Sequence, residues 1–255
     1  MSKERVEEIK PYDEQGSKRE QVEQMFDSIA PAYDFMNRAM TLGIDRWWRR
    51  VAVNGLISHF KKSDISNDIV DVLDVATGTG DFAIGLFKRL KPRSVTGIDL
   101  SNGMLDVARK KVASAGLTEI NFSQADCLSL PFADGSFDAV TVAFGVRNFE
   151  DIEQGYRQMY HVLRPDGMVS VVELSAPQNR IIRWFYDIYT MHIIPAIGAL
   201  KSGDRSAYRY LPLSIAAVPQ GEAMLDIMRR VGFTQCHVRR LTFGTCSIYT
   251  AVKKI

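Results

Sequence analysis

The chain has 255 residues, of which 46% are hydrophobic and 24% are charged, and its formal net charge is +2. This balance is typical of a globular protein with one large α/β domain, and the absence of a broad basic field predicts no nucleic-acid partner. Cys127, Cys236 and Cys246 form no C-x-x-C pair, so we expect no metal site, no disulfide framework and a reducing cytoplasm.

The first part of the chain is expected to be helical. Residues 1–20 are densely charged with both signs and have no apolar run of a secretory signal, so we interpret them as a flexible leader. Apolar and aromatic residues at helical spacing predict an N-terminal helical segment over residues 21–65, with its first helix over 21–29 ended by Pro31. In "RWWRR", buried tryptophans with arginines facing solvent are favoured over a nucleic-acid patch.

Strands and helices alternate in the middle of the chain. The pattern predicts strands over 69–75, 94–99, 120–124, 138–143 and 168–173, with helices over 82–90, 103–115 and 152–163 between them. This alternation with short connections predicts an α/β fold with a doubly wound, mostly parallel sheet.

The alternation stops after residue 173. Residues 175–218 are predicted to form a helical lid insertion, and their uncharged run over 188–200 is too short to span a membrane. A helix over 222–231 and two strands over 236–241 and 246–252, joined by a hairpin at "TFGT", predict an antiparallel strand at the C-terminal side of the sheet. Residues 21–255 are therefore expected to form a single domain.

The stretch "VLDVATGTGDFA" predicts a strand, a glycine turn and a helix start. Gly78 and Gly80 allow close approach of a ligand, which in open α/β sheets lies beyond the carboxyl ends of the strands. If the ligand contains a nucleoside, Asp99 can accept hydrogen bonds from both ribose hydroxyls, and Asp126 can accept one from an adenine amino group. Asp74 can fix the turn or contact a positively charged end of the ligand. A ligand with a positive charge and no phosphate fits these acids better than a dinucleotide, and S-adenosylmethionine is such a ligand.

Several further blocks carry a resemblance to a family. The blocks "LDVATGTGD", "GIDLSNGML", "ADCLSLPF" and "FDAVTVAFGVRN" resemble the motifs of Rossmann-like class I methyltransferases. "FDSIAPAYDFMNRAMTLGIDRWWRR", "FGVRN" and "LRPDGMVSVVELS" resemble the menaquinone/ubiquinone biosynthesis C-methyltransferase family, from Phe26 to the C-terminus. Two positions depart from the family pattern, Thr41 where it often has Ser and Asp166 where Gly is common.

The resemblance implies S-adenosylmethionine-dependent C-methylation of a polyprenylated quinol, with demethylmenaquinol favoured as the substrate. Methylation of a polyprenyl benzoquinol in ubiquinone biosynthesis, or of another small molecule or RNA, stays open within the class. Outside it, a nicotinamide-dependent oxidoreductase or a cofactor-binding regulatory module could use the same turn. Turnover of a quinol and binding of S-adenosylmethionine against NADH separate these alternatives.

The resemblance also assigns residues to the cofactor. Carried over position by position, it places Thr79 in the turn, Asp99 at the ribose and Asp126 at the adenine. It implies a backbone contact of Cys127 with the base, and it places Ala143 near the methyl donor. The Cys127 thiol itself is interpreted as a small filler.

Catalysis calls for activation of the quinol, because a quinone ring is electron-poor and an ionised quinol attacks a sulfonium methyl group far better. Arg147 in "FGVRN" is the first candidate to hold a phenolate or to orient a water, against the alternative of a salt-bridged surface arginine. His192 is a second candidate for the base. Tyr33, Asn148 and Tyr189 are candidates for substrate contact.

A prenylated substrate lives in the bilayer, so the enzyme is expected to meet it at the membrane surface. The segment 180–200 carries Trp184 and Phe185 beside Arg180 and Arg183, a mixture that suits the headgroup boundary. We therefore predict a cytoplasmic protein, peripheral at the inner face of the cell membrane, with a homodimer left open.

Overall fold

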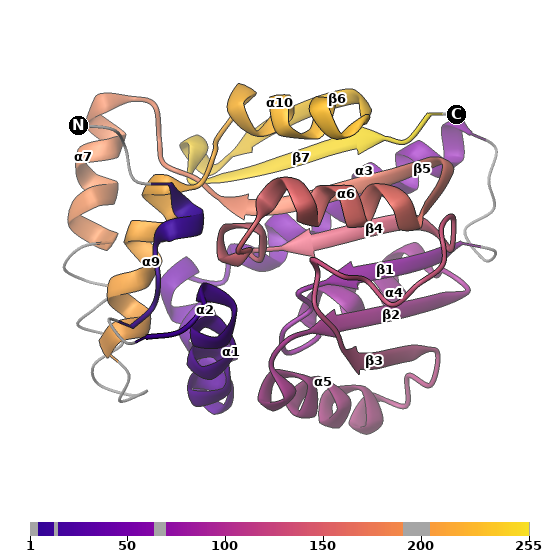
Figure 1. Cartoon of the computed structure of the whole chain (residues 1–255), viewed down its shortest axis with the longest axis horizontal. Coiled ribbons are helices and arrows are strands. Elements are labelled where there is room, and N and C mark those ends of the chain that lie inside the picture. Colours follow the sequence, from indigo (N-terminus) through magenta and orange to yellow (C-terminus); the bar gives the residue numbers. More distant parts are fainter. Residues whose placement is uncertain (1–4, 13–14, 64–69, 191–204, 255) are drawn as a thin grey trace.

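The computed structural model describes residues 5–12, 15–63, 70–190 and 205–254. Seven strands in this part of the chain form one sheet in the order β3-β2-β1-β4-β5-β7-β6 (Figure 1). They are β1 (Asp71–Val75), β2 (Ser94–Asp99), β3 (Ile120–Gln124), β4 (Phe137–Ala143), β5 (Leu163–Leu174), β6 (Thr234–Leu241) and β7 (Cys246–Val252). Strands β1 to β5 pair in parallel, whereas β7 is antiparallel to β5 and β6. The predicted mostly parallel sheet with an antiparallel C-terminal strand is confirmed.

Nine α-helices lie in the described part of the chain, and several of them have capping residues at their ends. The helices are α1 (Lys18–Ile29), α2 (Tyr33–Thr41), α3 (Asp45–Lys62), α4 (Asp81–Leu90), α5 (Asn102–Ala115), α6 (Ile152–Val162), α7 (Arg180–Ile188), α9 (Arg205–Ala217) and α10 (Glu222–Val231). Ser17 and Ser101 cap α1 and α5 by accepting a backbone hydrogen bond, and Gly116 ends α5 in the left-handed conformation.

Helices cover both faces of the sheet, as a doubly wound fold requires. Val72 and Leu73 are neighbours in β1 and point to opposite faces, so they belong to two separate hydrophobic clusters. Side chains of α3 and α4 pack in the cluster of Val72, and those of α6 and α10 in the cluster of Leu73. Burial on both faces explains why the inner strands, such as β1 and β4, are buried along most of their length, whereas the edge strands β3 and β6 carry exposed polar residues.

The described part of the N-terminal leader packs on the domain, which differs from the prediction of a flexible segment over residues 1–20. Val6, in the short 3₁₀ turn η1 (Val6–Glu8), is buried in the main core cluster. Lys18 is buried as well, and its Nζ donates to the carbonyl oxygens of Val6 (2.6 Å) and Arg147 (3.0 Å). Burial lowers the pKa of Lys18 to about 8. One aliphatic side chain and one lysine thus anchor a segment whose charge density suggested solvent.

The predicted lid insertion contains α7 and α9, which follow β5 in the chain. The first of them has no buried side chain, whereas α9 contributes Ala207 and Tyr210 to a core cluster with α1 and α2. Residues 191–204, including the candidate base His192, lie outside the described residues. Among the residues that are described, no helix is long and apolar enough to cross a membrane.

Four helices gather at one edge of the sheet and position the site. In Figure 1, α1, α2, α7 and α9 lie on the left, beyond the ends toward which the parallel strands β4 and β5 point. The short 3₁₀ turns η2 (Ala30–Ala32) and η4 (Val146–Asn148) connect elements at this edge, and η6 (Thr242–Gly244) joins β6 to β7. Helices α1 and α2 therefore cover the predicted ligand site at the strand ends, and α7 and α9 lie at the same edge of the sheet.

Candidate active site

The two glycines of the turn after β1 serve different purposes. Gly78 adopts the left-handed conformation (φ 56°), lines a pocket, and donates its backbone N–H to Asp99 Oδ2 at 2.8 Å. Gly80 is also left-handed (φ 78°), but a Cβ there would lie 3.0 Å from side-chain atoms of Ala108 and Phe122. Gly80 therefore permits close packing of the turn on α5 and β3, and Gly78 alone of the two faces the pocket.

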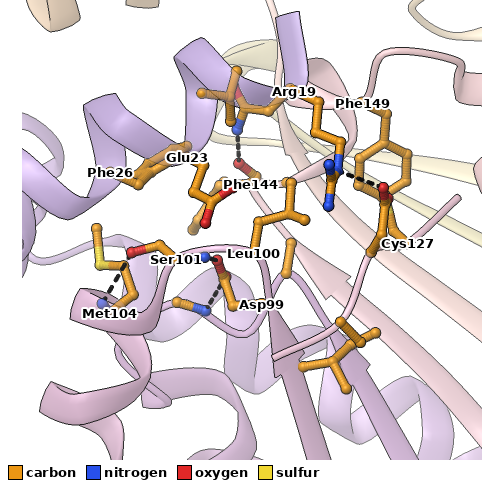
Figure 2. Close-up of a pocket in the computed structure, with 18 of the residues that line it drawn as sticks. Arg19, Glu23, Phe26, Asp99, Leu100, Ser101, Met104, Cys127, Phe144 and Phe149 are labelled. Atoms are coloured by element: carbon orange, nitrogen blue, oxygen red, sulfur yellow. Dashed lines mark hydrogen bonds and ion pairs between the residues drawn. The ribbon is translucent and has the colours of Figure 1, made fainter. Parts of the chain in front are cut away.

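The pocket beyond β1, β2 and β4, here called the strand-edge pocket, collects most of the predicted cofactor residues. The predicted residues that line it are Gly78, Asp99, Asp126, Cys127 and Ala143, and Tyr33 and Asn148 line it as well. Helix α1 closes the other side with Arg19, Glu23 and Phe26, opposite Asp99 and Ser101 (Figure 2). Sequence reasoning missed this contribution of α1, since nothing in its periodicity indicates which helix crosses the strand ends.

The carboxyl groups of Asp99 and Asp126 are both held in place. Asp99 accepts the backbone N–H groups of Gly78 and Ser101 (2.9 Å for the latter), and burial raises its pKa to about 6. Asp126 Oδ1 accepts from the backbone of Leu128 at 2.8 Å, and Oδ2 pairs with Arg19 Nε at 2.7 Å. Both acids can accept hydrogen bonds from a ligand in the pocket.

Besides Gly80, two predicted cofactor residues do not line the pocket, Asp74 and Thr79. Asp74 is buried behind the turn, where it accepts from Thr77 Oγ1 and Thr141 Oγ1, both at 2.6 Å, and burial raises its pKa to about 6. Of its two expected roles, Asp74 therefore has the one that fixes the turn. The Thr79 hydroxyl donates to Asp34 Oδ1 at 2.6 Å and so ties the turn to α2.

Cys127 lines the strand-edge pocket but offers no reactive thiol. Burial beside Asp126 raises the thiol pKa well above its usual value, so the thiolate needed for nucleophilic or metal-binding chemistry is disfavoured. The interpretation of the side chain as a filler agrees with this environment. Among the described residues, no three histidine, cysteine or acidic side chains come together as a metal site would need.

A second and largely apolar cavity of about 210 Å³, here called the apolar cavity, lies next to the first pocket. It is enclosed by α2, α3, α7 and α9 and by the turns near β5 and β7, and its lining includes Met40, Trp48, Leu174, Leu211 and Ile215. Tyr33 and Phe144 line both spaces, so the two meet at these rings. Phe144 is held there in a left-handed conformation (φ 61°), which is rare for a bulky residue and common at functional sites.

Arg147 lines the apolar cavity and is a buried arginine, which excludes the alternative of a surface ion pair. Its Nη1 pairs with Glu173 Oε1 at 2.9 Å and donates to the Phe144 carbonyl, and its backbone N–H donates to Glu173 Oε2 at 3.2 Å. Its buried Nε has no partner among the described residues. A buried arginine thus lines a cavity that could hold an oxygen of a ligand.

The three candidates for substrate contact lie in these spaces. Tyr33 borders both, Asn148 lines the strand-edge pocket with its buried Oδ1 unpartnered in the described part of the chain, and Tyr189 lines the apolar cavity. The Tyr189 hydroxyl donates to the Met40 carbonyl at 3.0 Å, which joins the lid to α2. Asp45 also lines the cavity; this could not be predicted from local patterns, because only the tertiary fold brings the start of α3 to it.

The arrangement suits transfer of a group between two bound molecules. A pocket with apolar walls and fixed carboxylates can hold a nucleoside-like ligand, and an apolar cavity beside it can hold a hydrophobic acceptor. Contact between the two at Tyr33 and Phe144 allows a donor atom and an acceptor atom to be aligned in line away from bulk water.

The sequence of the chain is similar to those of known methyltransferases. The family model of the ubiE/COQ5 methyltransferase family matches residues 14–253. The chain is 52% identical to a demethylmenaquinone methyltransferase of Bacteroides fragilis over 248 residues, covering 97% of this chain and 98% of that one. It is 45% identical to the enzyme of the same name from Porphyromonas gingivalis, over the same shares of the two chains.

Solved structures share the fold at low sequence identity. A SAM-dependent methyltransferase from Aquifex aeolicus matches with a TM-score of 0.55 at 17% identity, over 77% of this chain and 88% of that one. The [4+2]-cyclase SpnF matches with a TM-score of 0.58 at 18% identity, over 93% and 96%. The predicted Rossmann-like class I fold, methyltransferase activity and S-adenosylmethionine cofactor are confirmed. From the match over nearly its whole length, the chain belongs to the ubiE/COQ5 methyltransferase family.

Proposed function

We propose that this enzyme transfers the methyl group of S-adenosylmethionine to a ring carbon of a polyprenylated quinol, with demethylmenaquinol as the substrate. The observation that carries the proposal is the contact between the strand-edge pocket and the apolar cavity at Tyr33 and Phe144. The names of the relatives support the naphthoquinol, as two of them are demethylmenaquinone methyltransferases. A relative from Geotalea daltonii, 42% identical, is named for ubiquinone as well as menaquinone biosynthesis, which keeps the benzoquinol as the alternative.

In the proposed reaction, the strand-edge pocket and the apolar cavity bind different molecules. The strand-edge pocket holds the cofactor, whose sulfonium makes its methyl group electrophilic, and the apolar cavity holds the ring. Ionisation of a quinol hydroxyl places negative charge on the adjacent ring carbon, and the guanidinium of Arg147 can stabilise the charge on the oxygen. Aromatic walls around both molecules exclude water, which would otherwise stabilise the ionised ring in place of the protein.

The proposed function is tested by turnover of the pure enzyme. The enzyme is incubated without oxygen with S-adenosylmethionine labelled in its methyl group and with a short-chain demethylmenaquinol, and the product is identified by mass spectrometry. A short-chain benzoquinol lacking the same methyl group is run in parallel. Preferred methylation of the naphthoquinol supports the proposal, preferred methylation of the benzoquinol supports the alternative, and no methylation of either quinol contradicts both.

Asp99 is proposed to bind the two ribose hydroxyls of the cofactor. Replacing it with alanine removes hydrogen bonds to a charged acceptor, which contribute about 1.5–3 kcal/mol, so we expect Asp99→Ala to raise the dissociation constant of S-adenosylmethionine about tenfold or more. Isothermal titration calorimetry measures this change, with circular dichroism as the check of folding. Unchanged affinity in a folded variant would exclude the assignment.

The raised pKa of Asp99 also predicts a pH dependence of cofactor binding. The carboxylate is the better acceptor, so affinity should be constant well above pH 6 and should weaken as the pH falls through about 6, where Asp99 takes up a proton. Asp74 has a pKa in the same range and could contribute through the turn. Calorimetry from pH 5 to 8 on the wild type and on Asp99→Asn separates the two, because the variant should lose the dependence only if Asp99 causes it.

Contact with the membrane surface is proposed at the mouth of the apolar cavity. Trp184 and Phe185 in α7 are 59% and 62% exposed, and Leu42 and Phe243 are 80% and 79% exposed. Leu42 lines the cavity, and Phe243 follows Thr242, which also lines it. Exposed apolar side chains thus lie on elements that also line the cavity, where a prenyl tail would extend to the surface, and exposed Arg180 at the start of α7 can meet an anionic headgroup.

Replacing Trp184 and Phe185 together with serine is expected to reduce methylation of a long-tailed quinol in anionic liposomes while sparing a tail-less analogue in solution. The variant loses apolar area for the interface but no lining residue of either space, since neither aromatic lines them. The measurement is the ratio of the two activities relative to that of the wild type. Equal losses on both substrates would mean that the aromatics serve the fold of the lid.

The same experiment includes a control for the homodimer. Two copies that meet through α7 would bury Trp184 and Phe185 without any lipid. Analytical ultracentrifugation at several protein concentrations therefore accompanies the liposome assay. A dimer that dissociates in the double variant would assign these aromatics to a protein interface in place of the membrane.

A further inference from the structure

Two charged side chains line the otherwise largely apolar cavity in the described part of the chain, and one of them is a carboxylate. They are Arg147 and Asp45, and Asp45, the first residue of α3, is 2% exposed. The Asp45 Oδ1 atom accepts from Thr41 Oγ1 at 2.9 Å, and Oδ2 pairs with Arg49 Nη1 at 2.5 Å. An acid is also favourable in the first turn of a helix, so these contacts alone describe a structural role.

The structural role alone does not explain why Asp45 is buried in the wall of the apolar cavity. Burial of a carboxylate next to an apolar cavity is costly, and the same first-turn acid and i,i+4 ion pair would cost less on the solvent face of α3. Each carboxylate oxygen can accept more than one hydrogen bond, whereas each has one side-chain partner here. The cavity wall thus contains a fixed carboxylate whose capacity to accept hydrogen bonds is not used up, along with the guanidinium-bearing Arg147.

We propose that Asp45 accepts a hydrogen bond from a hydroxyl of the bound quinol and thereby makes the site select the reduced ring over the quinone. The proposal rests on the proposed function, since it needs the ring in the apolar cavity. A quinol donates through both hydroxyls, whereas a quinone has carbonyl oxygens that only accept. A carboxylate also only accepts, so a quinone at Asp45 would leave two acceptors facing each other in a dry cavity.

The quinol and the quinone rings have nearly the same shape, so a site can tell them apart only through polar groups. An apolar pocket discriminates poorly between isosteric ligands, whereas a site with a buried polar group rejects the ligand that leaves this group unpaired. Arg147 cannot supply the discrimination, because its guanidinium only donates and can donate to a quinone carbonyl as well as to a quinol oxygen. Asp45 is therefore the residue of the cavity whose chemistry separates the reduced from the oxidised substrate.

The test compares binding of one ring in two oxidation states. The protein is saturated with S-adenosylhomocysteine to prevent turnover and titrated calorimetrically, without oxygen, with a 1,4-naphthoquinol carrying one short prenyl group and with its quinone. We expect the wild type to bind the quinol at least about tenfold more tightly. In Asp45→Asn the amide can donate to a quinone carbonyl, so the ratio of the two dissociation constants should fall close to one.

Arg49→Gln is the matched control, because it breaks the same ion pair but leaves the Asp45 carboxylate in the cavity wall. The proposal predicts that Arg49→Gln keeps the preference for the quinol and that Asp45→Asn loses it. Asp45→Ser, a residue suited to a helix start, replaces Asp45→Asn if the latter does not fold. An unchanged ratio in a folded Asp45 variant, or equal loss in Arg49→Gln, overturns the proposal. A wild type that binds neither ring contradicts the proposed function instead.

Discussion

Arg147→Ala is expected to lower turnover of the quinol by about a hundredfold or more while leaving the affinity for S-adenosylmethionine nearly unchanged. Loss of one group that stabilises developing negative charge typically has a kinetic effect of this size. Arg147 lines the apolar cavity and not the strand-edge pocket, so the cofactor should not sense the change directly. Steady-state kinetics on a short-chain quinol and calorimetry with the cofactor measure the two effects on the same preparation.

Arg147→Lys is the control for charge. Lysine keeps the positive charge but lacks the planar guanidinium, whose Nη1 pairs with Glu173 and donates to the Phe144 carbonyl. We expect only partial recovery of turnover in this variant. Thermal unfolding must accompany the assays, as either substitution disturbs the buried partner Glu173. Near-normal turnover in both folded variants would assign Arg147 to structure and direct the search for the base to His192.

The sheet could be predicted from the sequence because each strand carries its own local signal. Strands β2, β3 and β7 have the predicted bounds, and the turn at Gly78 lies where glycine spacing places it. The strand around Met168 is longer than predicted, since β5 starts at Leu163. Polar residues in "LRPDG" conceal this extension: Leu163 pairs with Phe137 across an irregularity in the register.

The walls of the site could be predicted only in part, because local patterns carry no information about which distant helix covers a strand end. Asp99 and Asp126 follow strands, and that alone placed them at the ligand edge. Arg19 on α1 and Asp45 on α3 reach the two spaces only through tertiary packing. Thr79 is the converse case: it is in the predicted turn, but its side chain is directed to Asp34 on α2.

Glu173 is the buried counter-ion of Arg147, so its removal is expected to destabilise the site. It lies near the end of β5 with a buried side chain, and its two oxygens accept from the guanidinium and from the backbone N–H of Arg147. A surface ion pair contributes little because water screens it, but removal of one partner from a buried pair leaves the other charge without water or a counter-ion. Glu173 thus determines whether η4 and the guanidinium on it keep their place.

Glu173→Ala is accordingly expected to lower the free energy of unfolding by about 3–5 kcal/mol, because the variant retains a buried and unpaired Arg147. The double variant Glu173→Leu/Arg147→Met, which removes both charges and keeps apolar volume, should lose less stability than Glu173→Ala. Glu222→Ala is the matched control: its 2.5 Å pair with Arg229 is exposed and screened by water, so the expected loss is much smaller than that of Glu173→Ala. Urea unfolding at pH 7 measures all three. If Glu173→Ala costs no more than Glu222→Ala, the pair does not stabilise η4, and another contact, such as the Lys18 bond to the Arg147 carbonyl, must hold it.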